Sequence, residues 1–176
     1  LTTRRQRQMC IRDSLSTELL EIISESNDGR IVNVASNAHI GAEVDYENIN
    51  SEKNFSAWTS YCVSKLMNIM FTYQLSSIQD KVSANVLHPG FVDTNIAGNE
   101  GNFIKYIVKL GAKMFARTVD SGADSSIYLS TSDEVQNVSG KYFFKCKEIK
   151  SSRASYNKED WQKVWDLCNE YKIKLI

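Results

Sequence analysis

The sequence predicts an α/β domain with parallel strands, and three observations lead to this prediction. The short run at 31–35 is rich in β-branched residues, apolar on both faces and bounded by turn residues, and a second strand is expected at 82–87, where His88, Pro89 and Gly90 end it. Strands of this kind are typical of a parallel sheet that is covered on both sides. Between them, residues 58–78 show a long and densely apolar helical pattern. Two strands joined by a helix form a βαβ unit, in which a right-handed crossover is expected.

The composition is that of a globular protein, and it excludes several classes. Hydrophobic residues make up 42% of the chain, and 21 Lys and Arg balance 21 Asp and Glu. These values are inconsistent with disorder, collagen or a disulfide scaffold, and the neutral charge gives no support to a nucleic-acid partner. The four cysteines form no close pair and the two histidines complete no ligand spacing, so we expect reduced thiols and no metal site.

Residues 1–14, LTTRRQRQMCIRDS, do not fit the pattern that follows them. They contain several arginines, and their apolar residues show neither a helical nor a strand period. A basic arm for nucleic acid or anionic lipid is one interpretation. We favour a foreign or artefactual segment, which should be excluded from reasoning about the fold. The domain is then expected to occupy residues 15–176.

The elements after residue 14 are expected in a simple order. A helix over 15–23 precedes the first strand, and the polar residues 37–56 form a long loop after it. Loops of this length inside a compact domain are usually functional. The run GKYFFKC at 140–146 is expected to be a third strand. Further helices are expected over three ranges, 102–115, 121–130 and 158–171.

Tyr61 and Lys65 lie four residues apart on the 58–78 helix, so they share one face a turn apart. An ammonium beside a phenol favours the phenolate and lowers the phenol pKa from its reference value of about 10. Such a tyrosine can give or take a proton at a carbonyl or alcohol oxygen. The motif alone is weak, and a half-buried tyrosine with a solvated lysine is the plainer interpretation.

Polar residues also follow the carboxyl ends of both strands. Ser36 comes directly after the first strand, and residues 89–94 follow the second. In open α/β sheets, ligands bind beyond these ends. The Ser36 hydroxyl can stabilise charge on a substrate oxygen, Gly90 allows close backbone approach to a ligand, and Thr94 offers a hydroxyl. Each of these residues alone is most simply a turn residue. Three sites, namely Ser36, the turn at 89–94 and the Tyr61 and Lys65 pair on the helix, are nevertheless expected to meet at one edge of the sheet.

This combination resembles the short-chain dehydrogenase/reductase family. The matching segments are GRIVNVAS at 29–36, SYCVSK at 60–65 and NVLHPGFVDT at 85–94. Within the family the chain looks most like the retinol dehydrogenase group, through NAH after the serine and SKLMNIMFTYQLS at 64–76. The resemblance implies a doubly wound, Rossmann-like parallel sheet, truncated here to its last three strands.

The resemblance also implies roles for the site residues. Ser36 would orient the substrate oxygen, Tyr61 would be the general acid/base, and Lys65 would hold the nicotinamide ribose and lower the Tyr61 pKa. Besides Tyr61 and Lys65, the implied cofactor-binding residues are Pro89, Gly90, Val92 and Thr94. The implied reaction is hydride transfer between NADP(H), favoured over NAD(H), and an alcohol or carbonyl, such as a retinoid or another lipophilic aldehyde.

Several parts of the family pattern are missing from the sequence. None of the eight glycines precedes Gly29, so the glycine-rich phosphate loop is absent, as is the residue that selects NAD or NADP. We therefore expect the complete protein to be an enzyme and this chain to be its C-terminal part, inactive alone. One alternative is a non-catalytic isoform that acts as a binding partner. Another is an epimerase or dehydratase of the extended branch, which the HPGFVDT turn disfavours.

Membrane contact is expected only through a missing N-terminal segment, because no uncharged apolar run approaches the ~18 residues that a spanning helix requires. The resemblance is compatible with the cytoplasm or the cytoplasmic face of the endoplasmic reticulum, and the sequence does not choose between them.

Overall fold

The structure is a computed structural model that describes residues 4–50, 52–90 and 119–173. Its α-helices are α1 (Arg4–Glu18), α2 (Leu20–Ser24), α3 (Ala57–Ile78), α5 (Val119–Thr131) and α6 (Lys158–Ile173). Its strands are β1 (Gly29–Val34), β2 (Val82–Leu87), β3 (Tyr142–Phe144) and β4 (Lys147–Ile149). Short 3-10 helices are η1 (Asn37–His39), η2 (Tyr46–Asn48), η4 (Asp133–Val135) and η5 (Arg153–Tyr156).

The strands form one open sheet in the order β1-β2-β3-β4. Strands β1 and β2 pair in parallel from Gly29 opposite Val82 to Val34 opposite Leu87, and β3 continues the parallel sheet beside β2. Strand β4 runs antiparallel to β3. The α/β class and the βαβ unit β1-α3-β2 are therefore confirmed, whereas the prediction of three strands is wrong because a fourth strand is present.

The fourth strand comes directly after the run predicted as a single strand at 140–146. That run turns back at Lys145 and Cys146, which have φ of 51° and 59°. Two successive left-handed residues are typical of the tight type I′ hairpin turn. Neither residue is Gly or Asn, so the sequence lacks the usual signal for it. The Cys146 N–H donates to Oγ of the fully buried Ser125 on α5, at 3.0 Å, and so supports the turn.

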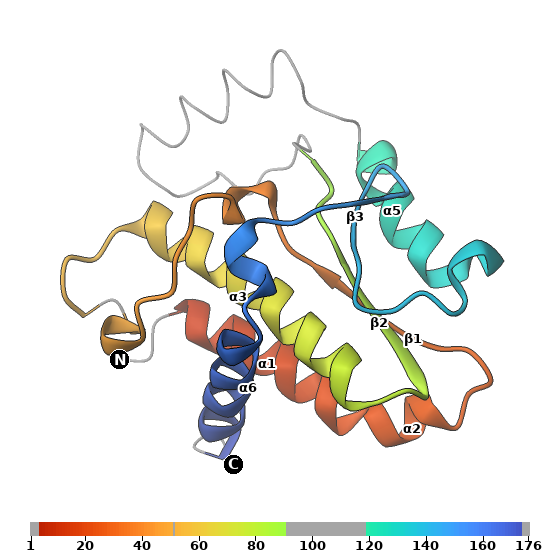
Figure 1. Cartoon of the computed structure of the whole chain (residues 1–176), viewed down its shortest axis with the longest axis horizontal. Coiled ribbons are helices and arrows are strands. Elements are labelled where there is room, and N and C mark those ends of the chain that lie inside the picture. The colour runs from red at the N-terminus through yellow and green to blue at the C-terminus, as the bar shows by residue number, and fades with distance from the viewer. Residues whose placement is uncertain (1–3, 51, 91–118, 174–176) are drawn as a thin grey trace.

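Helix α3 covers nearly the range that the sequence predicts, and a side-chain cap stabilises its first turn. The Ser56 hydroxyl accepts from the Thr59 N–H at 3.3 Å, which satisfies one of the free amides of the first turn. Leu66, Ile69 and Leu75 have no exposed surface at all. A helix that is apolar over most of its circumference has to be covered on several sides, and α3 is packed between the sheet and α6 (Figure 1).

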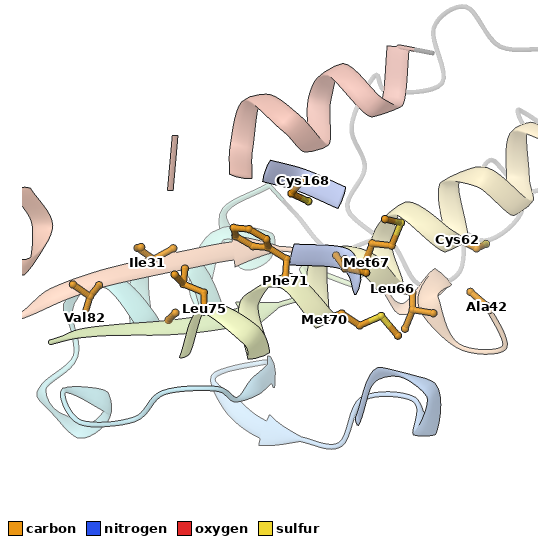
Figure 2. Close-up of a cluster of buried hydrophobic side chains, with 12 residues drawn as sticks. Ile31, Ala42, Cys62, Leu66, Met67, Met70, Phe71, Leu75, Val82 and Cys168 are labelled. Carbon is orange, nitrogen blue, oxygen red and sulfur yellow. The ribbon is translucent and has the colours of Figure 1, made fainter. Parts of the chain in front are cut away.

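Helices cover both faces of the sheet in the described part of the chain (Figure 1). On one face, Ile31, Val82 and Ala84 pack against α3 and α6 in the cluster drawn in Figure 2. On the other face, Leu87 packs with Leu129 of α5. Alternate residues of a strand point to opposite faces, and because both faces are covered, β2 is buried along almost its whole length.

Residues 4–18 form helix α1, so the expected helix over 15–23 in fact begins earlier and is divided at Leu19 into α1 and α2. Asp13 is 2% exposed, and the Cys168 thiol of α6 donates to its Oδ2 at 2.7 Å. Burial raises the pKa of the Asp13 carboxyl, and the neighbouring Arg12 opposes this rise. That residues 1–14 are foreign to the domain stays a prediction.

Two predictions fall outside the described residues, namely the helix over 102–115 and the cofactor contacts of Val92 and Thr94. In the part of the chain that the structure does describe, no helix is both long and apolar enough to cross a membrane.

Candidate functional site

Helix α3 presents Tyr61 and Lys65 together near its start. The Lys65 Nζ lies 5.5 Å from the centroid of the Tyr61 ring, over its face. Such a contact is favourable because the ring face is electronegative. The Tyr61 side chain is 38% exposed and stacks on Trp58 at 5.9 Å between ring centroids. The two residues that the sequence pairs by spacing are therefore neighbours, and the phenol is open to a ligand.

The environment of Lys65 weakens its hold on a proton. Partial burial lowers the pKa of the ammonium, and the positive charge of Arg12 lowers it further. Desolvation disfavours the charged form of an amine. A bound anion or an ionised phenol beside Lys65 would therefore stabilise the protonated, positively charged form of its side chain.

Ser36 lies just beyond the carboxyl end of β1, at the start of η1. Its backbone is extended, with φ of −152° and ψ of 151°, and its Oγ accepts from the Ala38 N–H at 3.2 Å. The hydroxyl thus caps the short helix η1 with its lone pair, and its proton remains available to an acceptor. Because η1 packs against α3, Ser36 is held on the α3 side of the sheet edge.

Pro89 and Gly90 follow β2 at the same edge as Ser36, because β1 and β2 are parallel and end in register. Gly90 has φ of 81°, in the left-handed region that favours glycine. Its N–H donates to Nδ1 of His88 at 3.2 Å. The edge therefore presents a backbone turn without a Cβ, which is the feature that a closely approaching ligand requires.

A chain of buried hydrogen bonds fixes α3 relative to β1. Asn33 Nδ2 donates to Thr72 Oγ1 at 2.9 Å, and the Thr72 hydroxyl donates to the Asn68 carbonyl at 2.8 Å. Asn68 Nδ2 then donates to the Val34 carbonyl at 3.3 Å. Tyr61, Lys65, Asn68 and Thr72 form one polar stripe on α3. The catalytic candidates Tyr61 and Lys65 therefore lie on the same face of α3 as the anchoring residues Asn68 and Thr72, on successive turns of the helix.

His39 lies beside Ser36 of the candidate site, and the sequence did not predict its burial. It lies in the polar stretch predicted as a loop, yet it is only 1% exposed. Its Nδ1 lies 2.7 Å from the Ser36 carbonyl, and its Nε2 accepts from the Ser152 N–H at 3.0 Å. No local period signals this burial, because the second partner is more than a hundred residues away in the sequence.

We expect the stability of the folded chain to fall below pH ~6.5, the ordinary His pKa, partly because of His39. Burial lowers the pKa of the folded imidazole, although its bond to Ser36 opposes this. As the pH falls through ~6.5, the unfolded chain takes up a proton that folded His39 refuses, so the free energy of unfolding decreases. The decrease stops once the pH passes the lower, folded pKa.

Urea unfolding measured at a series of pH values checks this expectation. The difference between the wild-type chain and His39→Gln isolates the contribution of this residue, since His88 and the carboxylates are common to both. An identical pH dependence in the two proteins would contradict the assignment of a lowered pKa to His39.

The described residues contain no group of three or more His, Cys, Asp or Glu side chains that could hold a metal ion. A polar pocket of about 280 Å³ is present, but it opens between residues 27–29, 79–83 and 136–139. These residues flank the starting ends of β1 and β2, so the pocket lies at the opposite end of the strands from Ser36 and is separate from the candidate site.

Comparison with known proteins identifies relatives of the same kind. The chain is 35% identical over 166 residues to human retinol dehydrogenase 14, covering 92% of this chain and 49% of that protein. It is 32% identical to human polyprenol dehydrogenase and 30% identical to mouse retinol dehydrogenase 12, covering 86% of this chain and 48% of each relative. The chain thus spans about half the length of the relatives that it matches. No family model matches it.

A solved structure of an uncharacterised protein from Mycobacterium paratuberculosis has a similar fold. The TM-score is 0.59 at 22% sequence identity, and the likeness covers 81% of this chain and 50% of that one. This supports the fold alone. The sequence matches confirm the resemblance predicted from the motifs: the chain is a distant homologue of the retinol dehydrogenases, in the short-chain dehydrogenase/reductase family, over about half of their length.

Proposed function

We propose that this chain contains the catalytic half of an NAD(P)-dependent oxidoreductase that interconverts an alcohol and a carbonyl compound. The observation that best supports this proposal is the pair formed by Tyr61 and Lys65, whose ammonium lies 5.5 Å from the phenol ring centroid. The pair is therefore suited to passing a proton to and from a substrate oxygen.

Each proposed residue has one task. In the reducing direction, Tyr61 donates its phenolic proton to the carbonyl oxygen as negative charge develops there, and Lys65 stabilises the resulting phenolate. The Ser36 hydroxyl donates a hydrogen bond to the same oxygen, while its own oxygen accepts from the Ala38 amide. The nicotinamide cofactor, when bound, supplies the hydride to the carbonyl carbon.

The residues after β2 fit the nicotinamide end of such a cofactor. Gly90 exposes backbone with no Cβ in a left-handed conformation, at the edge where ligands of α/β sheets bind. The proposed contacts of the nicotinamide are with Pro89, Gly90, Val92 and Thr94. Lys65 is the proposed partner of the nicotinamide ribose. NADP(H) is favoured over NAD(H). The phosphate-binding glycines would have to come from the half of the domain that this chain does not span.

The proposed substrate is a lipophilic aldehyde or alcohol, with a retinoid as the first candidate. Two of the relatives are named for apolar alcohols, retinol and polyprenol. The side chain stacked on Tyr61 is that of Trp58, which is 59% exposed. An exposed tryptophan beside the proton donor offers an apolar surface to a long hydrocarbon chain.

A two-half enzyme would test the proposal. It is built by joining the N-terminal half of human retinol dehydrogenase 14 to residues 15–176 of this chain. We expect this protein to consume NADPH when retinal is added, measured by the loss of NADPH absorbance and the formation of retinol. Changing Ser36→Ala is expected to lower kcat by about a hundredfold, because one donor to the developing oxyanion is lost.

Two results would contradict parts of the proposed function. A folded two-half enzyme that binds NADPH but reduces neither retinal nor any other aldehyde would reject the catalytic proposal and favour a non-catalytic binding partner. Equal kcat in the wild-type and Ser36→Ala proteins would remove Ser36 from the mechanism while leaving the reaction class intact.

A further inference from the structure

The imidazole of His39 has one hydrogen bond on each ring nitrogen, and the two partners differ in kind. A backbone carbonyl, that of Ser36, lies 2.7 Å from Nδ1, and a backbone N–H, that of Ser152, lies 3.0 Å from Nε2. A carbonyl can only accept and an N–H can only donate. Both contacts are satisfied only by a neutral ring with its proton on Nδ1.

These contacts determine how Ser36 is presented at the end of β1. Its carbonyl accepts from the His39 backbone N–H at 3.2 Å and also from the ring nitrogen, so the peptide plane after Ser36 is held by two donors. Its hydroxyl oxygen accepts from the Ala38 N–H at 3.2 Å. With the backbone and the Oγ lone pair both fixed, the hydroxyl proton has few directions left in which to point.

The same ring joins the serine to parts of the chain that are remote in sequence. The His39 ring meets Tyr142 of β3 edge-on at 5.2 Å, and its Nε2 bond reaches Ser152 at the start of η5. Being 1% exposed, the ring has no water to replace either partner. A buried donor or acceptor that loses its partner carries the full cost of desolvation, so the arrangement resists local displacement.

We propose that His39 is a positioning residue, whose neutral Nδ1–H imidazole holds Ser36 in place for the substrate oxygen and ties it to the segment before η5. The inference rests on the oxidoreductase function proposed above. It differs from the alternative of an ordinary core histidine, because it assigns the two nitrogens separate roles. The nitrogen facing Ser36 serves the reaction, and the nitrogen facing Ser152 serves the fold.

The full chain tests the first part without any turnover. Nitrogen-15 spectra of the two histidines should show His39 with a protonated Nδ1 and an unprotonated Nε2 at neutral pH. In a second variant, Ser152→Pro removes the N–H donor together with the Ser152 hydroxyl, and it suits the backbone because φ of Ser152 is already −64°. There we expect the Nδ1–H form of His39 to persist, because the Ser36 carbonyl still accepts from Nδ1 and an Nε2–H would face no acceptor. An Nε2–H form in the wild-type chain would overturn the proposal.

Two substitutions of His39 separate positioning from packing. In His39→Asn, the side-chain amide nitrogen occupies the place of Nδ1 and can still donate to Ser36, but nothing reaches Ser152. In His39→Gln, the amide oxygen approaches the place of Nε2 and can accept from Ser152, but the donor to Ser36 is lost. In the two-half enzyme we expect kcat to fall about ten- to a hundredfold for Gln, and at least several-fold less for Asn, with KM changed little in either.

The outcomes separate this inference from the function on which it rests. Equal losses of kcat in the two variants, with both proteins folded by circular dichroism, would overturn the positioning role. If the wild-type two-half enzyme has no turnover, the proposed function fails, and the nitrogen spectra still decide the tautomer. In that case, amide exchange of Ala38 in the full chain reports on Ser36. Faster exchange in His39→Gln than in His39→Asn supports the positioning role, and equal rates reject it.

Discussion

Replacing Tyr61 by Phe is expected to lower kcat of the two-half enzyme by about a hundred- to ten-thousandfold, the range that a positioned general acid contributes. The change removes one oxygen atom and keeps the ring. The stacking on Trp58 and the contact with Lys65 are contacts of the ring and should persist. The loss should therefore appear in kcat, while the affinity for NADPH stays within about twofold. Steady-state kinetics with retinal and NADPH fluorescence titration measure the two quantities.

Tyr128→Phe is the matched control, because it makes the same chemical change on the other side of the sheet. The Tyr128 hydroxyl donates to Glu134 at 3.0 Å, and the half-buried Tyr128 ring packs near Phe143 in the cluster on the α5 face of the sheet. We expect kcat of this variant to equal that of the wild type. A fall of less than threefold in Tyr61→Phe would mean that another group donates the proton, and it would reject the proposed mechanism at its central step.

The change Phe71→Ala is expected to destabilise the chain by about 3–5 kcal/mol, the usual cost of deleting a buried phenylalanine ring. Phe71 is 1% exposed and stacks on Trp165 of α6, with ring centroids 5.2 Å apart and planes at 20°. It lies among the buried side chains that join α3 to β1 and α6 (Figure 2). Since domains are stable by only ~5–15 kcal/mol, the variant should unfold at much lower urea concentration or not fold at all.

Two further variants show that burial is the cause. Phe55→Ala makes the same change at a side chain that is 61% exposed, and we expect a difference of less than ~0.5 kcal/mol. Phe71→Leu keeps most of the apolar volume and should cost less than the alanine change, because less cavity is left behind. Similar midpoints for Phe71→Ala and Phe55→Ala would contradict the packing of α3 between β1 and α6.

The sequence predicts those parts of the fold that depend on near neighbours. The strand runs at 31–35 and 82–87 and the helix between them follow from local periods, and the structure has β1, α3 and β2 at these places. The pairing of Tyr61 with Lys65 also follows from helix geometry alone, since residues four apart share a face. Hydrogen bonds and side-chain spacing inside one element need no information about the rest of the chain.

The β3–β4 hairpin shows where such reasoning fails. Its turn uses Lys145 and Cys146 in left-handed conformations that neither residue type favours. A buried serine of α5 supports that turn through the Cys146 amide. A local pattern of aromatic residues predicts a strand, but the turn that reverses the chain is supported by a contact with a helix elsewhere in the sequence.

The candidate site also contains residues that the sequence predicts and residues that only the tertiary structure reveals. From the sequence alone come Ser36 after a strand, the Tyr61 and Lys65 pair, the turn at Pro89 and Gly90, and with them the resemblance to reductases. Only the tertiary structure decides that His39 is buried and that it contacts Ser36 on one side and Ser152 on the other. The physical reason is that a tautomer and a buried polar contact depend on what lies opposite, and residue 152 is brought opposite residue 39 only by the folded sheet and the segment before α6.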